Sequence, residues 1–198
     1  MNTFIKSLIL AVAAFAVTTM SGCAVIPSTT EMNYTPTAHA QRIQNAGVVG
    51  VKVTGGQEDG VISYKRNGYG MKLAKLASEK PINEVVADAF NQELLARGFQ
   101  TSDASNTIIN VHLTKYFEDT DVHFSSADFN SDVDANVTVT KNNAQIFSKT
   151  IAGKGTDVRG FFGVGGDDYT KNSFQKSTAD ALNQLFSDPA FIAAISNK

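Results

Sequence analysis

The sequence predicts an α+β domain in which two main helices pack on an antiparallel sheet. Segments with β-branched or alternating apolar residues are gathered between residues 47 and 155, and apolar stripes at helical spacing follow Pro81 and residue 170. Strands and helices that are segregated in this way are typical of the α+β class. The roughly 150 residues that follow Ala46 are enough to form one domain with its own core.

The first strand and a hairpin are expected between residues 47 and 80. Residues 47–54 are short, β-branched and bounded by glycines, as in a strand. The dipeptide Asn67-Gly68 predicts a two-residue type I′ turn, because both central residues of that turn need φ > 0. The cross-strand pairs would then be Arg66 with Tyr69, Tyr64 with Met71, and Ile62 with Leu73.

The first helix is predicted to begin at Pro81, which has no N–H to lose at the first helical position. Gly98 after Arg97 predicts a C′ glycine, with Phe99 folding back on the last turn as in a Schellman motif. One apolar stripe is formed by Ile82, Val85, Val86, Ala89, Phe90 and Leu94. Burial of this stripe in the core accounts for all six residues.

Three more strands and two helices are expected in the second half. Residues 107–117, 128–140 and 145–155 have strand character, and the last two are joined by an Asn-rich turn at residues 141–144. A helix over residues 170–186 would be followed by a short one that has Asp188 as N-cap and Pro189 at its first position. The inward residues of the longer helix would be Phe174, Thr178, Ala181, Leu182 and Leu185.

Cys23 is the only cysteine among the 198 residues, and it ends the sequence Met20-Ser21-Gly22-Cys23. A basic start with Lys6 and an apolar run over residues 8–17 precede it. That run fits a signal peptide and is shorter than the ~20 residues that cross a bilayer. These features match the bacterial lipobox, with Met20 where Leu is usual. We therefore predict a signal peptide over residues 1–22, cleavage before Cys23, and acylation of Cys23 with palmitate-like chains.

We expect the acylated Cys23 to hold the protein on a membrane, because several acyl chains bind far more tightly than one. Its place beside the apolar run argues against a free thiol or an intermolecular disulfide. Similarity to bacterial lipoprotein sorting signals, with Ala24 after the cysteine, predicts the periplasmic face of the outer membrane. Residues 24–46 are polar and irregular, so residues 23–46 are predicted to be the lipidated cysteine and a flexible tether. A single periplasmic domain would then cover residues 47–198.

The charge balance argues against nucleic acid as a partner. The chain has 17 basic and 19 acidic residues, for a net charge of −2. Loss of the predicted signal would remove only Lys6 among the charged side chains. Nucleic-acid-binding domains usually carry clustered Lys and Arg, and polybasic membrane patches need them as well. With one cysteine, no intrachain disulfide can form, so the fold depends on its hydrophobic core.

Several patterns that suggest catalysis or metal binding fail on closer reading. Asp128-x-Asn130-x-Asp132-x-Asp134 resembles a calcium loop, but Val133 and Val139 stand where an EF-hand needs Gly and Glu. The alternation instead predicts the solvated face of a strand, with a weak surface cation site as the alternative. Gly153-Lys154-Gly155 does not complete a Walker A motif and is expected to be a flexible strand end. The histidines His39, His112 and His123 lack metal-ligand spacing. We therefore predict no catalytic residue, metal or cofactor, although a spatial triad can escape sequence reading.

Residues 160–166 form a glycine-rich loop that contains Phe161, Phe162 and Val164. Two adjacent phenylalanines of one strand cannot both face the same core. The loop could fold its aromatic rings onto the following helix. Alternatively, Phe161, Phe162 and Val164 could be an exposed contact for a partner or for lipid.

The arrangement resembles the YajG-type lipoproteins of Gram-negative bacteria. The resemblance rests on the lipobox, the helix ending Leu94-Leu95-Ala96-Arg97-Gly98-Phe99, the Asn-rich turn, and the late helix around Ala179-Asp180-Ala181-Leu182-Asn183. It implies an outer-membrane lipoprotein with a periplasmic domain, and it supplies no activity or catalytic residues. The Phe161–Phe162 loop has no counterpart in the resemblance.

These features favour a non-enzymatic factor that binds another envelope component, through an envelope protein partner that the sequence does not identify. The alternative is a carrier or transport accessory that holds a lipid or other amphiphile between helices and sheet. An apolar cleft of ligand size would favour the carrier, and a solid core with an exposed apolar patch would favour the binding factor. Converging carboxylates with perturbed pKa values would instead favour a hydrolase acting on cell-wall material.

Overall fold

The computed structural model describes residues 26–36, 41–160 and 167–196. In chain order the strands and helices are β1 (Ser28–Thr30), β2 (Val48–Gly55), β3 (Val61–Arg66), β4 (Lys72–Ser78), α2 (Ile82–Ala96), β5 (Gln100–Thr101), β6 (Thr107–Val122), β7 (Ser126–Lys141), β8 (Ala144–Gly160), α3 (Asp167–Phe186) and α4 (Pro189–Ile195). Cys23, Phe161, Phe162 and Val164 lie outside the described residues.

Two mixed sheets carry the helices. The larger sheet has the order β5-β2-β6-β7-β8 and the smaller one β1-β4-β3. The prediction of an antiparallel sheet is correct for β6-β7-β8 and for β3-β4, but β2 runs parallel to both β5 and β6, and β1 runs parallel to β4. Helix α2 lies in the crossover that a parallel β2–β6 pair requires. The α+β class is therefore confirmed, with mixed rather than purely antiparallel sheets.

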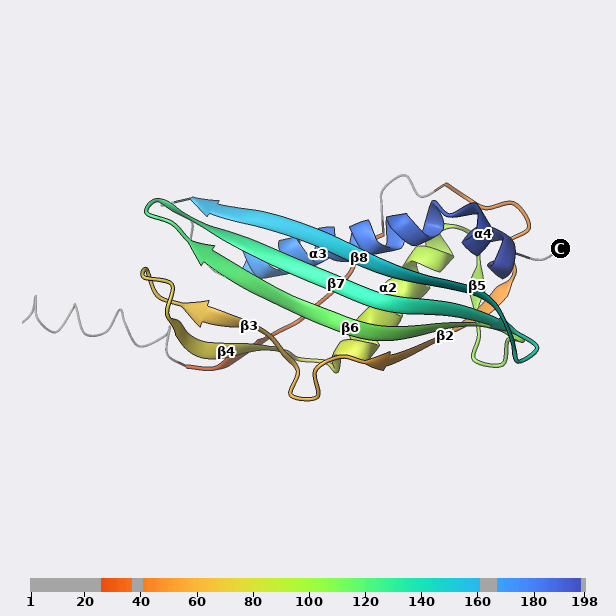
Figure 1. Cartoon of the computed structure of the whole chain (residues 1–198), viewed down its shortest axis with the longest axis horizontal. Helices are drawn as coiled ribbons and strands as arrows, with labels where there is room; N and C mark the ends of the chain where they lie inside the picture. The colour runs from red at the N-terminus through yellow and green to blue at the C-terminus, as the bar shows by residue number, and fades with distance from the viewer. Residues whose placement is uncertain (1–25, 37–40, 161–166, 197–198) are drawn as a thin grey trace, which may run out of the picture.

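Strands β6, β7 and β8 give the molecule its length (Figure 1). Each has 16 or 17 residues, which corresponds to about 50 Å at the usual strand rise. The predicted alternation is confirmed: one face of β7 packs on the helices and the other carries Asp and Asn residues. The inward residues of β6 and β7 include Ile109, Val111, Leu113, Phe129, Val133, Ala135, Val137 and Val139, all buried.

The β3–β4 hairpin does not have the predicted two-residue turn. Residues 67–71 form the turn, Gly70 has φ +79°, and the Asn67 side chain accepts hydrogen bonds from the backbone N–H groups of Tyr69 and Met71. The Asn67 carboxamide therefore satisfies the two amides of a longer loop. This shifts the register, so that Tyr64 pairs with Lys75 and Lys65 with Ala74. The predicted pairs, including Tyr64 with Met71, are wrong.

The two-residue loop with positive φ occurs instead between β7 and β8. Asn142 and Asn143 have φ of 50° and 64°, and Lys141 pairs with Ala144 on either side of them. This is the backbone geometry that favours asparagine in a tight hairpin. The end of the molecule that contains the 67–71 turn and the β6–β7 turn is called the hairpin end. The other end, which contains this β7–β8 turn, is called the opposite end.

Helix α2 confirms the predicted stripe and cap. Pro81 has an extended ψ of 136° and stands just before the helix rather than inside it. At the C-terminus, Gly98 has φ +95°, its N–H donates to the Leu95 carbonyl, and the Phe99 N–H donates to the Leu94 carbonyl. These two bonds are those of a Schellman motif. All six residues of the predicted stripe are buried.

Helix α3 lies directly on β8 because two glycines leave room for it. A Cβ atom at Gly153 would stand 2.0 Å from the Ser177 carbonyl oxygen, and one at Gly155 would stand 2.0 Å from the Ser173 carbonyl oxygen. The expectation that Gly153 and Gly155 form a flexible strand end is wrong, since both lie within β8 beneath a helix. Asp188 caps α4 as predicted, because its side chain accepts from the Ala190 N–H at 2.9 Å.

The segment 26–36, called the strap, belongs to the fold. Its strand β1 pairs with β4, and Met32 and Tyr34 are buried against α2 and α3. The Gln175 side chain both accepts from the Thr35 N–H at 2.9 Å and donates to the Thr35 carbonyl at 2.7 Å. The predicted tether over residues 23–46 is therefore wrong for the strap, whose alternate residues Thr30, Met32 and Tyr34 point inward.

A buried ion pair holds the strap at its inner end. The Tyr34 hydroxyl donates to Glu93 Oε2 at 3.0 Å, and Arg97 donates to Glu93 Oε1 at 2.9 and 2.7 Å. The Arg97 guanidinium also lies 4.5 Å from the centre of the Phe186 ring.

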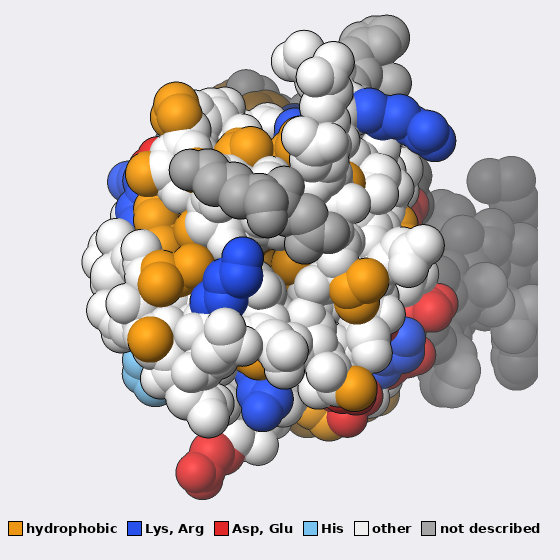
Figure 2. All heavy atoms as spheres, turned by 90° about the vertical axis from the view of Figure 1, so that its right-hand side faces the viewer, with side chains coloured by type: hydrophobic (Ala, Val, Ile, Leu, Met, Phe, Trp, Pro, Cys, Tyr) orange, Lys and Arg blue, Asp and Glu red, His pale blue; other side chains and the backbone are white. Residues whose placement is uncertain are grey.

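Viewed from the opposite end, apolar side chains are scattered among uncharged groups and a few Lys or Arg side chains (Figure 2). None of the helices within the described ranges is long and apolar enough to span a membrane.

Candidate functional site

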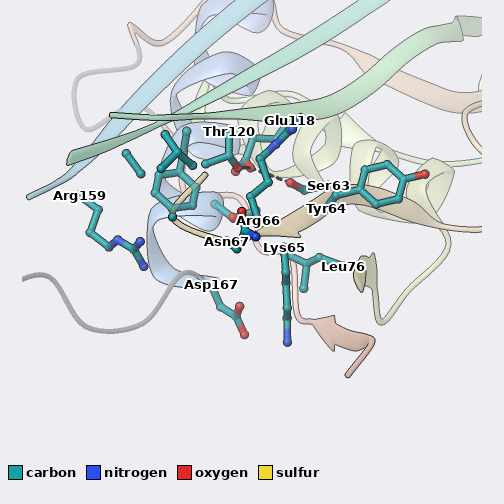
Figure 3. Close-up of a pocket in the computed structure, with 15 residues that line it drawn as sticks. Ser63, Tyr64, Lys65, Arg66, Asn67, Leu76, Glu118, Thr120, Arg159 and Asp167 are labelled. Carbon is teal, nitrogen blue, oxygen red and sulfur yellow. Dashed lines mark hydrogen bonds between the residues drawn. The ribbon is translucent and has the colours of Figure 1, made fainter. Parts of the chain in front are cut away.

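A cavity of about 330 Å³ lies at the hairpin end, where the two sheets and the start of α3 meet. The β3–β4 hairpin, β6, β7, β8 and α3 all contribute to it (Figure 3). Its lining consists of Ser63, Tyr64, Lys65, Arg66, Asn67, Gly68, Leu76, Glu118, Thr120, Val122, Ala127, Phe129, Arg159, Asp167 and Thr170. The lining is mixed, with an apolar part from Leu76, Val122, Ala127 and Phe129.

Glu118 is a buried acid in the wall of this cavity. The residue is 1% exposed and points inward from β6. Its Oε1 accepts from Ser63 Oγ at 2.8 Å and from Thr120 Oγ1 at 3.1 Å, while Oε2 accepts from Ser173 Oγ at 3.3 Å. Burial raises the pKa of the Glu118 carboxyl above its ordinary value, and the donating hydroxyls oppose that rise. The hydroxyl groups thus solvate a carboxylate that water reaches poorly.

A β-bulge brings Glu118 to the inner face. The β6–β7 register shifts between Leu113 and Lys115, so the inward positions change from odd-numbered residues, such as Leu113, to even-numbered ones, such as Tyr116 and Glu118. Such an extra residue turns every later side chain to the other face. The strand predicted from sequence periodicity ends at residue 117. The sequence therefore gives no signal for Glu118 or for the cavity.

Three basic side chains surround the cavity. Arg66 pairs with Asp119 and donates to the Gly70 carbonyl at 2.8 Å. Within the described residues its Nε is buried without a hydrogen-bond partner. The Arg159 guanidinium lies 6.0 Å from the centre of the Phe129 ring, and Lys65 Nζ donates to the Ile26 carbonyl at 3.2 Å. These groups favour an uncharged polar or anionic ligand group over a cationic one.

Described residues on both sides of the predicted contact loop line this cavity. Arg159 and Asp167 line it on the two sides of residues 160–166 (Figure 3). Phe161, Phe162 and Val164 themselves lie outside the described residues, so their role stays a prediction. Cys23 also lies outside, and the structure does not test its acylation.

The other sequence candidates do not gather into one site. His112 Nδ1 lies 3.3 Å from Thr54 Oγ1, and His123 Nε2 lies 3.1 Å from Asp128 Oδ2. Asp132 on the outer face of β7 forms an ion pair with Lys115, which raises the pKa of the Lys115 ammonium. No group of three or more His, Cys, Asp or Glu residues within the described ranges is placed to hold a metal ion. His39 lies outside these ranges.

The comparisons with known proteins identify the family. A family model described as "Uncharacterized lipoprotein" matches residues 35–196. The chain belongs to this lipoprotein family. No curated protein gives a significant match to the sequence. Family membership supports a membrane-anchored bacterial lipoprotein, in agreement with the lipobox that ends at Cys23.

Two solved structures are similar to this chain at low sequence identity. A Xanthomonas campestris protein of the DUF330 family has a TM-score of 0.50 and 10% identity, over 81% of this chain and 92% of that chain. A minor lipoprotein from Acinetobacter baumannii has a TM-score of 0.41 and 7% identity, over 79% of this chain and 98% of that chain. The first similarity supports the α+β fold alone.

Proposed function

We propose that this lipoprotein is a non-enzymatic binding or assembly factor of the YajG type, held on the periplasmic face of the outer membrane by acyl chains on Cys23. The hairpin-end cavity is its binding site. The observation that carries the proposal is this cavity of about 330 Å³, which falls at the lower end of the range for ligand sites, roughly 300–1,000 Å³. A cavity of this size suits one side chain or one polar head group of a larger partner.

The chemistry of the lining supports binding rather than catalysis. The Glu118 carboxylate is already used by the hydroxyls of Ser63, Thr120 and Ser173. A nucleophilic serine would need a base that is free to take its proton, and the described lining contains no histidine. The second acid, Asp167, stands on the rim beside the start of α3, apart from Glu118 (Figure 3).

The amphiphile carrier is the second candidate, and the apolar part of the lining favours it. Val122, Ala127 and Phe129 could contact a short alkyl segment. However, the space between the helices and the large sheet is filled by buried side chains such as Phe90, Phe174 and Leu182. Beside Met32 and Tyr34 the remaining volume is only about 10 Å³. A lipid tail held between helices and sheet, as a carrier would require, has no room there.

Site-specific photo-crosslinking in cells tests the binding proposal. A photoreactive residue is placed at Asn67 or Lys65 on the rim, and at Gln145 on the opposite end as the matched control. We expect a discrete adduct from the rim positions and none from Gln145. Adducts from neither rim position, or the same adducts from both ends, would contradict the assignment of the cavity as the binding site. Lipid that copurifies with the unanchored Cys23→Ser protein would favour the carrier instead, because a carrier holds its lipid away from the membrane.

A further inference from the structure

The hairpin end exposes large apolar side chains at the tips of its turns. Tyr69 and Met71 in the β3–β4 turn are 92% and 58% exposed, and Phe124 in the β6–β7 turn is 100% exposed. Ile26, the first described residue of the strap, is 61% exposed. Single exposed apolar residues are ordinary, but several on neighbouring turns mark a surface that meets an apolar phase.

These turns lie beside each other. Asn67 and Gly68, which precede Tyr69, line the same cavity as Val122 and Ala127, which flank the turn that contains Phe124. Both turns stand at the same end of the elongated molecule (Figure 1). The three apolar tips therefore belong to one face of the protein.

The strap leads the lipid attachment point to this same face. Strand β1 fixes Ser28 opposite Leu76, and Lys65 Nζ holds the Ile26 carbonyl at 3.2 Å. From Cys23 to Ile26 there are three residues, which reach at most ~11 Å. The opposite end lies about 50 Å away along β6, β7 and β8. An acyl group on Cys23 can therefore enter a bilayer next to the hairpin end and not next to the opposite end.

We propose that the hairpin end rests on the phospholipid surface, with Tyr69, Met71 and Phe124 in the interfacial layer and the cavity rim at the level of the head groups. This inference rests on the acylation of Cys23 in the proposed function. It also names the ligand class of the cavity, a phospholipid head group. The phosphate of such a group is an acceptor for Lys65 or Arg159, which line the cavity.

Weak insertion of these three side chains into the bilayer is enough to keep the hairpin end on the membrane surface in this arrangement. The acyl chains keep the hairpin end at a high effective concentration next to the bilayer, so that each contact becomes intramolecular. Tyrosine suits such an interface because its ring is apolar and its hydroxyl remains wet. Two acids of this end have a basic side chain beside them, since Asp119 pairs with Arg66 and Asp128 lies 3.1 Å from His123.

Tryptophan fluorescence provides a direct test, because the chain contains no tryptophan. Phe124→Trp and the matched control Ile146→Trp, which is at an exposed position of the opposite end, each carry a single probe. The acylated full-length proteins are reconstituted into vesicles of phosphatidylethanolamine and phosphatidylglycerol, with or without brominated acyl chains. We expect blue-shifted emission and strong bromine quenching at position 124, and neither at position 146.

The same samples separate the two proposals. If the protein floats with the vesicles but position 124 is not quenched, the membrane-facing surface is wrong while the anchoring stands. Equal quenching at positions 124 and 146 would also overturn it, because the domain would then lie flat on the bilayer. A Cys23→Ser protein serves as the anchoring control. If the unmodified sequence floats no better than Cys23→Ser, the anchoring itself fails and the inference fails with it.

Discussion

At the opposite end, apolar side chains and the buried Glu93–Arg97 ion pair fill the space between sheet and helices, whereas at the hairpin end this space holds hydroxyl groups, the buried Glu118 and a cavity. Phe186 and Phe191 pack edge to face at 5.3 Å in the first region. Ser131, Ser173 and Glu118 occupy the corresponding layer in the second. The same three strands and the same helix α3 run through both regions. The difference indicates that close packing is concentrated at one end of the fold, while the other end has a cavity in its place.

The largest expected effect contrasts one phenylalanine from each end. Phe191 is fully buried between Phe147 and Phe186, so Phe191→Ala should reduce the free energy of unfolding by about 3–5 kcal/mol. Phe129 lines the cavity and is 6% exposed, and water can occupy the space that Phe129→Ala leaves. Urea unfolding should therefore give a smaller decrease in the free energy of unfolding for Phe129→Ala than for Phe191→Ala. Equal losses would remove the energetic difference between the two ends.

The next effect is expected at the contact between α3 and β8. Gly155→Ala would place a Cβ atom 2.0 Å from the Ser173 carbonyl and 2.5 Å from the Ser177 nitrogen. We expect the free energy of unfolding to decrease by at least about 1–3 kcal/mol, because α3 and β8 must move apart to make room for the added methyl group. Gly160→Ala on the same strand is the matched control, since no atom of the described residues lies within 4 Å of its Cβ position. If both variants have the same urea midpoint, the close approach of α3 is wrong.

A third effect is expected in the strap. Tyr34→Phe removes the donor to Glu93 Oε2, and loss of a hydrogen bond to a buried charged group costs about 1–3 kcal/mol. The amides of residues 28–35 should then exchange hydrogen faster, while those of α4 stay protected. Glu31→Ala, at an exposed strap position, is the control. Unchanged exchange in Tyr34→Phe would mean that this hydroxyl does not hold the strap on the domain.

The smallest effect concerns pH and the hairpin end. Burial raises the pKa of Glu118 in the folded state. Ionisation of Glu118 therefore costs more free energy in the folded state than in the unfolded state. As pH rises through the folded-state pKa, the protein loses the stability that the protonated Glu118 contributes. Glu118→Gln removes that ionisation. We therefore expect the variant to gain stability relative to the wild type on going from acidic to neutral pH. Thermal unfolding of both proteins between these limits measures the gain, and parallel curves would contradict it.

Local patterns in the sequence predicted the parts of the fold that depend on neighbours in the chain. The α2 stripe, its Gly98 cap, the alternation of β7 and the Asp188 cap all follow from spacings of a few residues. The parallel pairing of β2 with β6 depends instead on a crossover over about fifty residues, which no local pattern specifies. The sequence of the strap contains a strand-like alternation that could have predicted its burial. Inward Thr30, Met32 and Tyr34 alternate there with polar residues.

The candidate site could not be predicted because a single bulge creates it. Without the shift between Leu113 and Lys115, Glu118 would face solvent and the cavity would lose its buried acid. The N-terminal cysteine and the loop around Phe161 were visible from composition and motif alone. What the structure adds concerns the described residues next to both, since Ile26 at the start of the strap and Arg159 before the loop lie at the hairpin end.

The central claim is that the hairpin end faces the bilayer and the opposite end faces the periplasm. Hydrogen exchange of the unmodified, acylated protein on vesicles, compared with the Cys23→Ser protein in solution, tests it without any probe. We predict slower exchange for the turns at residues 67–71 and 123–126, and unchanged exchange for residues 141–146. Equal protection of the two ends, or protection confined to residues 141–146, would contradict the account.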